Sequence, residues 1–103
     1  MIEINVVELE RRIGDGDIIM LDVREGFELE IAKVRDSLHI PMGEIKKRIK
    51  DLDKEKNYAV LCHSGYRSAQ VCHFMELEGF NVVNVQGGID SWSVYVDKGI
   101  KRY

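Results

Sequence analysis

Hydrophobic residues along this chain fall into short continuous runs that alternate with amphipathic stretches. The runs at 18–21, 58–61 and 82–85 have the length and composition of strands that are covered on both faces. In the stretches between them, apolar residues recur at intervals of three or four, as on a helix with one buried face. The pattern predicts strands at 2–4, 18–21, 38–40, 58–61 and 82–85, separated by helices at 6–13, 25–32, 44–52 and 68–78, with a last helical stretch around Trp92.

Strands separated by helices predict an α/β fold with a mostly parallel central sheet and helices on both faces. Local signals agree, because Asn5 can cap the first helix and Gly79-Phe80 can end the fourth. Pro41 is the only proline and marks a turn, and no repeat or linker divides the chain. We therefore expect one domain over residues 1–103, which is a common size for an independent fold.

The composition narrows the class of partner. Hydrophobic residues make up 45% and charged residues 32% of the 103 residues, as in an ordinary soluble protein. The net charge of −3 argues against a nucleic-acid partner. No apolar run is long enough to span a bilayer, and Glu3, Glu8 and Glu10 interrupt the start of the chain, which lacks the apolar core of a signal peptide. We expect a cytoplasmic protein with no membrane partner.

The two cysteines, Cys62 and Cys72, form neither a C-x-x-C pair nor a metal-binding cluster, so we expect no metal and no cofactor. If Cys62 ends a strand and Cys72 lies on the next helix, the two are separated by roughly 7 Å or more along the helix axis. That distance is too long for an unstrained disulfide, and two free thiols fit a reducing compartment. Cys72 lies on the apolar stripe of its helix, which favours a place in the core over a role as a second reactive thiol.

Cys62 is the candidate nucleophile, because a strand ends there, Gly65 turns the chain and a helix begins near Arg67. Backbone N–H groups that converge in such a turn form an anion-binding nest, and the helix N-terminus adds partial positive charge. A cysteine in that position should be a thiolate at neutral pH and needs no partner base. The residues expected to bind the substrate are His63, Ser64, Gly65, Tyr66, Arg67 and Ser68.

Other side chains have plainer interpretations. A buried structural cysteine is the alternative for Cys62, but the glycine, the arginine and the helix start that follow it favour a reactive site. Asp22 ends a buried strand, and we expect it to pair with Arg24 or a loop amide and to support the site without acting as a catalyst. Trp92 fits core packing or a pocket wall. His63 can tune the thiol or contact the donor, and it can equally be a solvated loop residue.

The segment Cys-His-Ser-Gly-Tyr-Arg-Ser at 62–68 resembles the active-site loop of rhodanese domains, in which cysteine and arginine are separated by four residues. Three further blocks resemble signatures of the same family and occur in the family's order. They are Leu21-Asp22-Val23-Arg24-Glu25, His39-Ile40-Pro41, and Val85-Gln86-Gly87-Gly88-Ile89 followed by Trp92.

The resemblance implies a single-domain rhodanese-like sulfurtransferase. Cys62 would attack the outer sulfur of thiosulfate or of a persulfide and hold it as a persulfide until a thiol, or cyanide in an assay, removes it. Arg67 and the loop amides of 63–68 would hold the charge. The implied partners are a small anionic sulfur donor and a thiol acceptor, either a small molecule or a protein. The chain departs from the family at 32–37, where Lys33 and Arg35 replace part of a glycine-containing segment and can add positive potential at the mouth of the site.

Two other functions remain open. A cysteine phosphatase or arsenate reductase also uses a thiolate followed by arginine, but those loops place five residues between the two, whereas this chain has four. The shorter loop should fit a single sulfur atom better than a phosphoryl group, so we expect no turnover of an aryl phosphate. The second alternative is a non-enzymatic rhodanese-like module that binds a partner or senses sulfide or oxidants. Such modules often lack the cysteine that this chain keeps.

Overall fold

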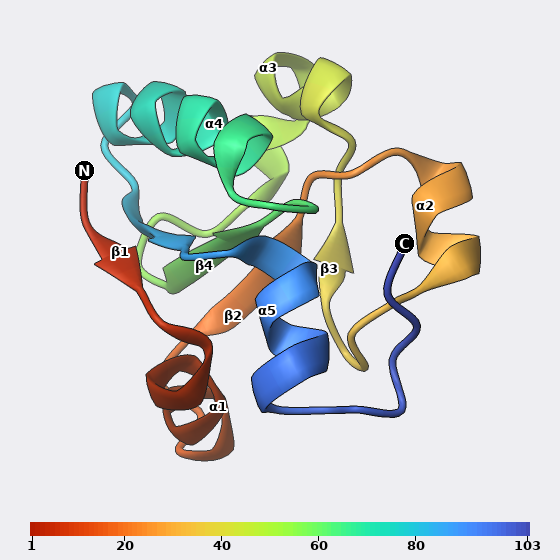
Figure 1. Cartoon of the computed structure of the whole chain (residues 1–103). Coiled ribbons are helices and arrows are strands. Elements are labelled where there is room, and N and C mark those ends of the chain that lie inside the picture. Colours follow the sequence, from red (N-terminus) through yellow and green to blue (C-terminus); the bar gives the residue numbers. More distant parts are fainter.

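Five parallel strands form a central sheet in the computed structural model, which describes all of residues 1–103 (Figure 1). The strands are β1 (Glu3–Ile4), β2 (Ile19–Asp22), β3 (Leu38–His39), β4 (Asn57–Leu61) and β5 (Asn81–Val85). The helices are α1 (Val6–Gly14), α2 (Gly26–Ile31), α3 (Ile45–Arg48), α4 (Tyr66–Leu77) and α5 (Gly88–Tyr95). The strand order is β1-β5-β4-β2-β3, and every pairing is parallel. The predicted α/β class is confirmed.

Hydrophobic side chains are buried on both faces of this sheet. Along β4, Tyr58 and Val60 belong to one core cluster, and Ala59 and Leu61 belong to the other. This alternation follows from the strand period of two. The first cluster packs against α3 and α4, and the second packs against α1 and α5, as the layers in Figure 1 show. Because β4 is the middle strand, it is covered on both faces, and its residues 58–61 are all buried.

Two of the helix ends follow the predicted signals. Asn5 is extended, and its side-chain oxygen accepts a hydrogen bond from the N–H of Glu8 at 2.9 Å, which caps α1. At the end of α4, Gly79 has φ +89° and the N–H of Phe80 donates to the carbonyl of Met75 at 3.0 Å. This is the left-handed glycine ending that satisfies the last carbonyls of a helix. The longest helix has 12 residues, and no helix is long and apolar enough to cross a membrane.

The predicted helix over 44–52 is wrong in its form. The segment consists of a 3₁₀ turn at Met42–Glu44, the short helix α3 and a second 3₁₀ turn at Ile49–Asp51. No side chain caps α3, and Lys46 and Lys50 are like charges four residues apart, which disfavours a continuous helix. The apolar stripe still faces the core, since Ile45 and Ile49 are buried.

Candidate active site

Cys62 follows the last residue of β4, so it lies at the carboxyl end of the middle strand, where open parallel sheets bind their ligands. The chain turns at Gly65, whose φ of +111° favours glycine, and α4 begins at the next residue. This helix starts two residues earlier than the sequence predicted, which brings its N-terminus closer to the cysteine. The N-terminal end of a 12-residue helix therefore lies beside the thiol.

Two groups contact the sulfur of Cys62. The N–H of Gly65 donates to Sγ at 3.1 Å, and Ser68 Oγ lies 3.3 Å from it. The sequence predicted that several loop N–H groups would converge on the sulfur, whereas in the structure only the N–H of Gly65 contacts it. The N–H groups of Tyr66, Arg67 and Ser68 are in the first turn of α4 and have no acceptor within the helix, so they remain available at the start of the helix.

A polar chain extends from Ser68 to the edge of the sheet. Ser68 Oγ donates to Asn84 Oδ1 at 2.5 Å. Asn84 Nδ2 donates to the carbonyl of Gly65 and to the carboxylate of Glu3, each at 3.1 Å. Ser68 and Asn84 are both buried, whereas Glu3 on the edge strand β1 is exposed. All buried side-chain polar atoms in the structure have a partner.

The first residues of α5 hold the cysteine loop from the other side. The N–H of Ile89 donates to the carbonyl of Cys62 at 2.9 Å, and the N–H of Asp90 donates to the carbonyl of His63 at 3.2 Å. A Cβ at Gly88 would lie 2.3 Å from the His63 carbonyl oxygen, so no other residue allows this approach. The Gly87-Gly88 signature therefore serves to bring α5 against the loop.

Arg67 does not contact the sulfur in this structure. Its guanidinium donates to both oxygens of Glu28, at 2.7 and 2.9 Å. Hydrogen bonds from Arg67 lower the pKa of Glu28 to about 2, against the opposing effect of burial, and a hydrogen bond from Tyr103 adds to the lowering. The same pair raises the pKa of Arg67. The positive charge that the sequence assigned to an anionic donor is therefore shared with Glu28, a residue that the sequence analysis missed.

Tyr103 is a second residue that the sequence analysis missed. Its ring stacks on the ring of His63, with centroids 4.0 Å apart and planes 10° from parallel. Its hydroxyl donates to Glu28 Oε2 at 2.7 Å and accepts from Arg24 Nη1 at 2.9 Å. The end of the described chain thus lies against the cysteine loop and α2 (Figure 1).

Asp22 and Arg24 form a buried ion pair below this layer, with Arg24 Nη2 donating to Asp22 Oδ2 at 2.8 Å. Burial works against the charge of Arg24, but its hydrogen bonds to Asp22 and Tyr103 raise its pKa. His39 Nε2 lies 2.7 Å from the Arg24 carbonyl oxygen. These contacts fix the chain after β2, as expected for residues that support a site without reacting in it.

Lys33 and Arg35, the candidates for a positively charged rim, are both exposed. Arg35 lines a groove of about 240 Å³ together with residues of α1 and α5, among them Ile13 and Trp92. None of residues 62–68 lines that groove, so the structure places Arg35 beside a different surface. Trp92 is a residue of α5 and is buried in the core cluster between α1, α5 and the sheet, in agreement with its predicted packing role.

Cys72 lies in the core, as predicted. It is fully buried in the cluster between the sheet and α4, and burial raises the pKa of its thiol to about 12, with a smaller contribution from Glu76. Cys62 and Cys72 are both free thiols. Cys72 therefore cannot serve as a ready nucleophile at neutral pH.

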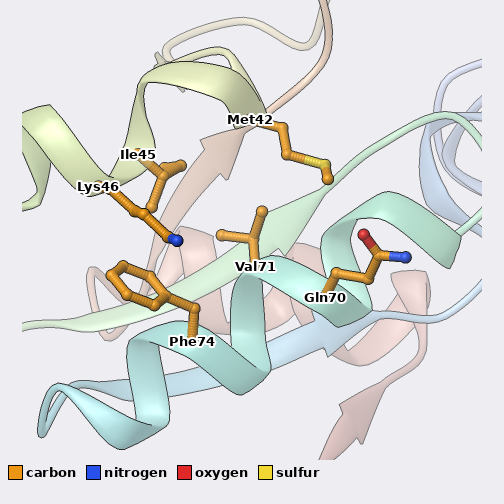
Figure 2. Close-up of a pocket in the computed structure, with 6 residues that line it drawn as sticks. All are labelled: Met42, Ile45, Lys46, Gln70, Val71 and Phe74. Atoms are coloured by element: carbon orange, nitrogen blue, oxygen red, sulfur yellow. The ribbon is translucent and has the colours of Figure 1, made fainter.

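The sulfur of Cys62 is closed off from solvent, since the residue is only 1% exposed. A shallow groove of about 150 Å³ lies between α4 and the segment that contains α3 (Figure 2). Its apolar lining is formed by Met42, Ile45, Val71 and Phe74, and Cys62 does not reach it. This groove therefore does not lead to the sulfur of Cys62.

Two of the residues that sequence reasoning missed left a signal. Asn84 interrupts the apolar run of 82–85, and a polar side chain in a buried strand needs hydrogen-bond partners. Glu28 lies between Phe27 and Leu29 on a short helix near the Asp-Val-Arg block. Nothing in the sequence pointed to Tyr103, because its contacts join segments far apart in the chain.

A cysteine at the end of the middle strand, a glycine turn and a helix N-terminus on an all-parallel sheet define a class of α/β domains with a cysteine loop at the carboxyl edge of the sheet. The family model described as Rhodanese-like domain matches residues 5–94. The chain belongs to the rhodanese-like family, which confirms the resemblance found in its motifs.

Similar proteins agree with this assignment. The chain is 38% identical over 91 residues to "Putative sulfurtransferase YtwF" of Bacillus subtilis, which covers 87% of this chain and 88% of that protein. It is 32% identical over 93 residues to a sulfurtransferase of Allochromatium vinosum, with 88% and 87% covered. A crystal structure of a rhodanese-related protein from Thermoplasma volcanium matches with a TM-score of 0.88 and 38% identity over 93% of this chain and 94% of that one. Relatives named as sulfurtransferases thus match nearly the whole chain.

Proposed function

We propose that this protein transfers a sulfane sulfur from thiosulfate or a persulfide to a thiol, with Cys62 as the carrier. The observation that supports this most is the hydrogen bond from the Gly65 N–H to Cys62 Sγ at the N-terminus of α4. A donor N–H and a helix N-terminus both stabilise negative charge on sulfur. The relatives named as sulfurtransferases support the same reaction class.

In the first half of the cycle, the Cys62 thiolate attacks the outer sulfur of the donor. The bond between the two donor sulfurs breaks, and its electron pair leaves with sulfite or with the donor thiolate. A new sulfur–sulfur bond on Cys62 gives a persulfide, whose charge lies on the outer sulfur. The free N–H groups of Tyr66, Arg67 and Ser68 are suitable donors to that atom.

In the second half, an acceptor thiolate attacks the outer sulfur and Cys62 leaves as a thiolate. One sulfur–sulfur bond replaces another in each half, so the two halves together are balanced without an external oxidant or reductant. The same Gly65 N–H that stabilises the attacking thiolate stabilises the leaving thiolate. This double displacement is the usual behaviour of a covalent nucleophile.

Arg67 contributes to this reaction while paired with Glu28. A guanidinium has five N–H donors, of which Glu28 uses two. The side chain of Arg67 is 33% exposed, so the remaining donors can meet an anionic donor at the mouth. Glu28 reduces the net positive charge there, which favours donors with one negative charge over dianions.

The direct experiment weighs the intact protein after treatment with thiosulfate and, separately, with glutathione persulfide. The proposal expects a mass gain of one sulfur atom in the parent and none in Cys62→Ser. Cyanide should then release thiocyanate from the parent and not from Cys62→Ser. Cys72→Ser is the matched control and should gain the sulfur as the parent does. A parent that stays unmodified by either donor contradicts the proposal.

A further inference from the structure

Asn84 is a buried residue of β5 that bonds to both of the residues that contact the sulfur of Cys62. Gly65 and Ser68 are the two residues whose atoms contact Cys62 Sγ. Asn84 Nδ2 donates to the carbonyl of Gly65, and Asn84 Oδ1 accepts from Ser68 Oγ. One side chain therefore links the two groups that contact the nucleophile.

The direction of each hydrogen bond in this chain is fixed by chemistry. The Glu3 carboxylate and the Gly65 carbonyl can only accept, so the NH₂ group of Asn84 must face both of them. The carbonyl oxygen of Asn84 then faces Ser68, and the single hydroxyl hydrogen of Ser68 must point at it. Ser68 Oγ consequently turns a lone pair, and not a hydrogen, toward Cys62.

This orientation treats the two charge states of Cys62 differently. A thiol can donate its hydrogen to Ser68 Oγ across the 3.3 Å contact. A thiolate cannot receive a hydrogen from Ser68 unless the hydroxyl leaves Asn84, whose buried oxygen then loses its partner. The Gly65 N–H donates to the sulfur in either state, so Gly65 and Ser68 act in opposite directions.

We propose that Asn84 is a positioning residue of the sulfur transfer described above, which holds the Ser68 hydroxyl away from Cys62 and so favours the thiol over the empty thiolate. The persulfide escapes this penalty, because its negative charge lies on the outer sulfur and Sγ is uncharged. Asn84 therefore lowers the population of the reactive thiolate without opposing the sulfur-loaded form. The inference rests on the proposed function only for its role in transfer, because the ionisation of Cys62 can be measured without any donor.

The other charged or titratable groups around the loop are unchanged in the Asn84 and Ser68 variants. Those on the packed elements are Arg67 and Cys72 on α4, Asp22 at the end of β2, Arg24 after it, Glu28 on α2, Glu3 on β1, Asp90 on α5, His63 in the loop and Tyr103. None of them bonds to Ser68, and Asn84 reaches the sulfur by two routes, through the Ser68 hydroxyl and through Gly65.

The test measures the rate of alkylation of Cys62 by iodoacetamide as a function of pH. In Asn84→Ala, the released hydroxyl can donate to the thiolate, so the midpoint of the profile should move to lower pH. A hydrogen bond to a charged group predicts alkylation about tenfold faster or more near pH 6. In a Ser68→Ala background, the same Asn84→Ala change should move the midpoint much less.

The Ser68→Ala background distinguishes a directed hydroxyl from a general structural effect. Equal shifts in both backgrounds, no shift, or a shift to higher pH would overturn the proposal. A normal alkylation profile together with no sulfur uptake from either donor would instead contradict the proposed function and leave the role of Asn84 intact.

A single variant decides the matter if Asn84→Ala does not fold. In the parent, Ser68 Oγ accepts from the thiol and turns no hydrogen toward the thiolate. Ser68→Ala should therefore move the midpoint of the alkylation profile to lower pH. No shift, or a shift to higher pH, as expected if the hydroxyl donated to the thiolate, would overturn the proposal.

Discussion

Cys62 and Cys72 are both buried free thiols in the same core cluster, and they differ in what surrounds the sulfur. Cys72 lies within α4, where the helix N–H groups are already bonded to carbonyls, and burial raises its pKa to about 12. Cys62 lies beyond the N-terminus of the same helix and receives the N–H of Gly65. The two thiols share the same degree of burial and differ in the hydrogen-bond donors around the sulfur, and the proposed difference in their reactivity depends on those donors.

The largest expected effect comes from exchanging the two cysteines separately. Cys62→Ser should lower sulfur transfer by about 10³-fold or more, since the covalent carrier is lost. Cys72→Ala should keep transfer within about threefold and cost roughly 1 kcal/mol of stability through a small cavity. Thiocyanate formation and denaturant unfolding measure the two effects. Similar losses of activity in both variants would break the comparison between the two thiols.

Gly65→Ala should give the next largest effect. The φ of +111° at this position is strained for any residue with a side chain, although the space around it would accept a Cβ. The turn should shift and draw its N–H away from Cys62. We expect transfer to fall about tenfold or more and stability to fall by about 1–2 kcal/mol. Gly14→Ala, which meets open space at the end of α1, is the control and should leave transfer unchanged without lowering stability.

Glu28→Gln tests the ion pair at the mouth of the site. The pKa of Glu28 is lowered to about 2 from an ordinary value near 4.5, so its carboxylate stabilises the fold above about pH 4.5. That contribution is lost as pH falls from about 4.5 through about 2, and it amounts to roughly 2–3 kcal/mol. Acid unfolding should therefore depend less steeply on pH in Glu28→Gln than in the parent. Identical pH dependence in the two proteins would show that the pair does not stabilise the fold.

Glu28→Gln should also change the choice of donor. Without the carboxylate, Arg67 carries an unshared charge, and kcat/KM for thiosulfate should rise relative to that for glutathione persulfide. Glu30→Gln, on the same short helix but exposed, is the control for removing one negative charge. A ratio that moves equally in the two variants would assign the effect to net charge and not to the pair with Arg67.

Tyr103→Phe should have the smallest effect. The change removes the hydrogen bonds to Glu28 and Arg24 and keeps the ring that stacks on His63. We expect a stability loss of about 0.5–1.5 kcal/mol and transfer within about threefold of the parent. Tyr95→Phe, at an exposed position, should be neutral by the same unfolding measurement. A fall in transfer well beyond threefold, with the stability loss still in this range, would show that the hydroxyl takes part in holding the donor.

The sequence predicted the strands, their parallel arrangement and the position of Cys62, because these follow from short-range patterns. Apolar runs specify buried strands, and Gly65 marks the turn before α4. The contacts of the arginines were predicted less completely. Arg24 has Asp22 two residues away, and that pairing was one of the two expected, whereas Arg67 pairs with Glu28 across the fold.

The rest could not be predicted because it depends on which residues the fold brings together. Tyr103 meets His63 and Glu28 only after the chain has crossed from α5 to α2. The apolar stripe at 44–52 predicted a continuous helix. The structure has shorter helical turns there, because repulsion between neighbouring lysines disfavours a continuous helix. Asn84 could have been noticed as a polar residue in a buried strand, but its partners are set by strand order.

The most direct test of the central claim locates the transferred sulfur in the parent protein. The protein is treated with a sulfane sulfur donor, its thiols and persulfides are alkylated, and the peptides are weighed. The account predicts one extra sulfur on the peptide that contains Cys62 and none on the peptide that contains Cys72. Sulfur on Cys72, or an unmodified Cys62 under conditions that keep the protein folded, would contradict it.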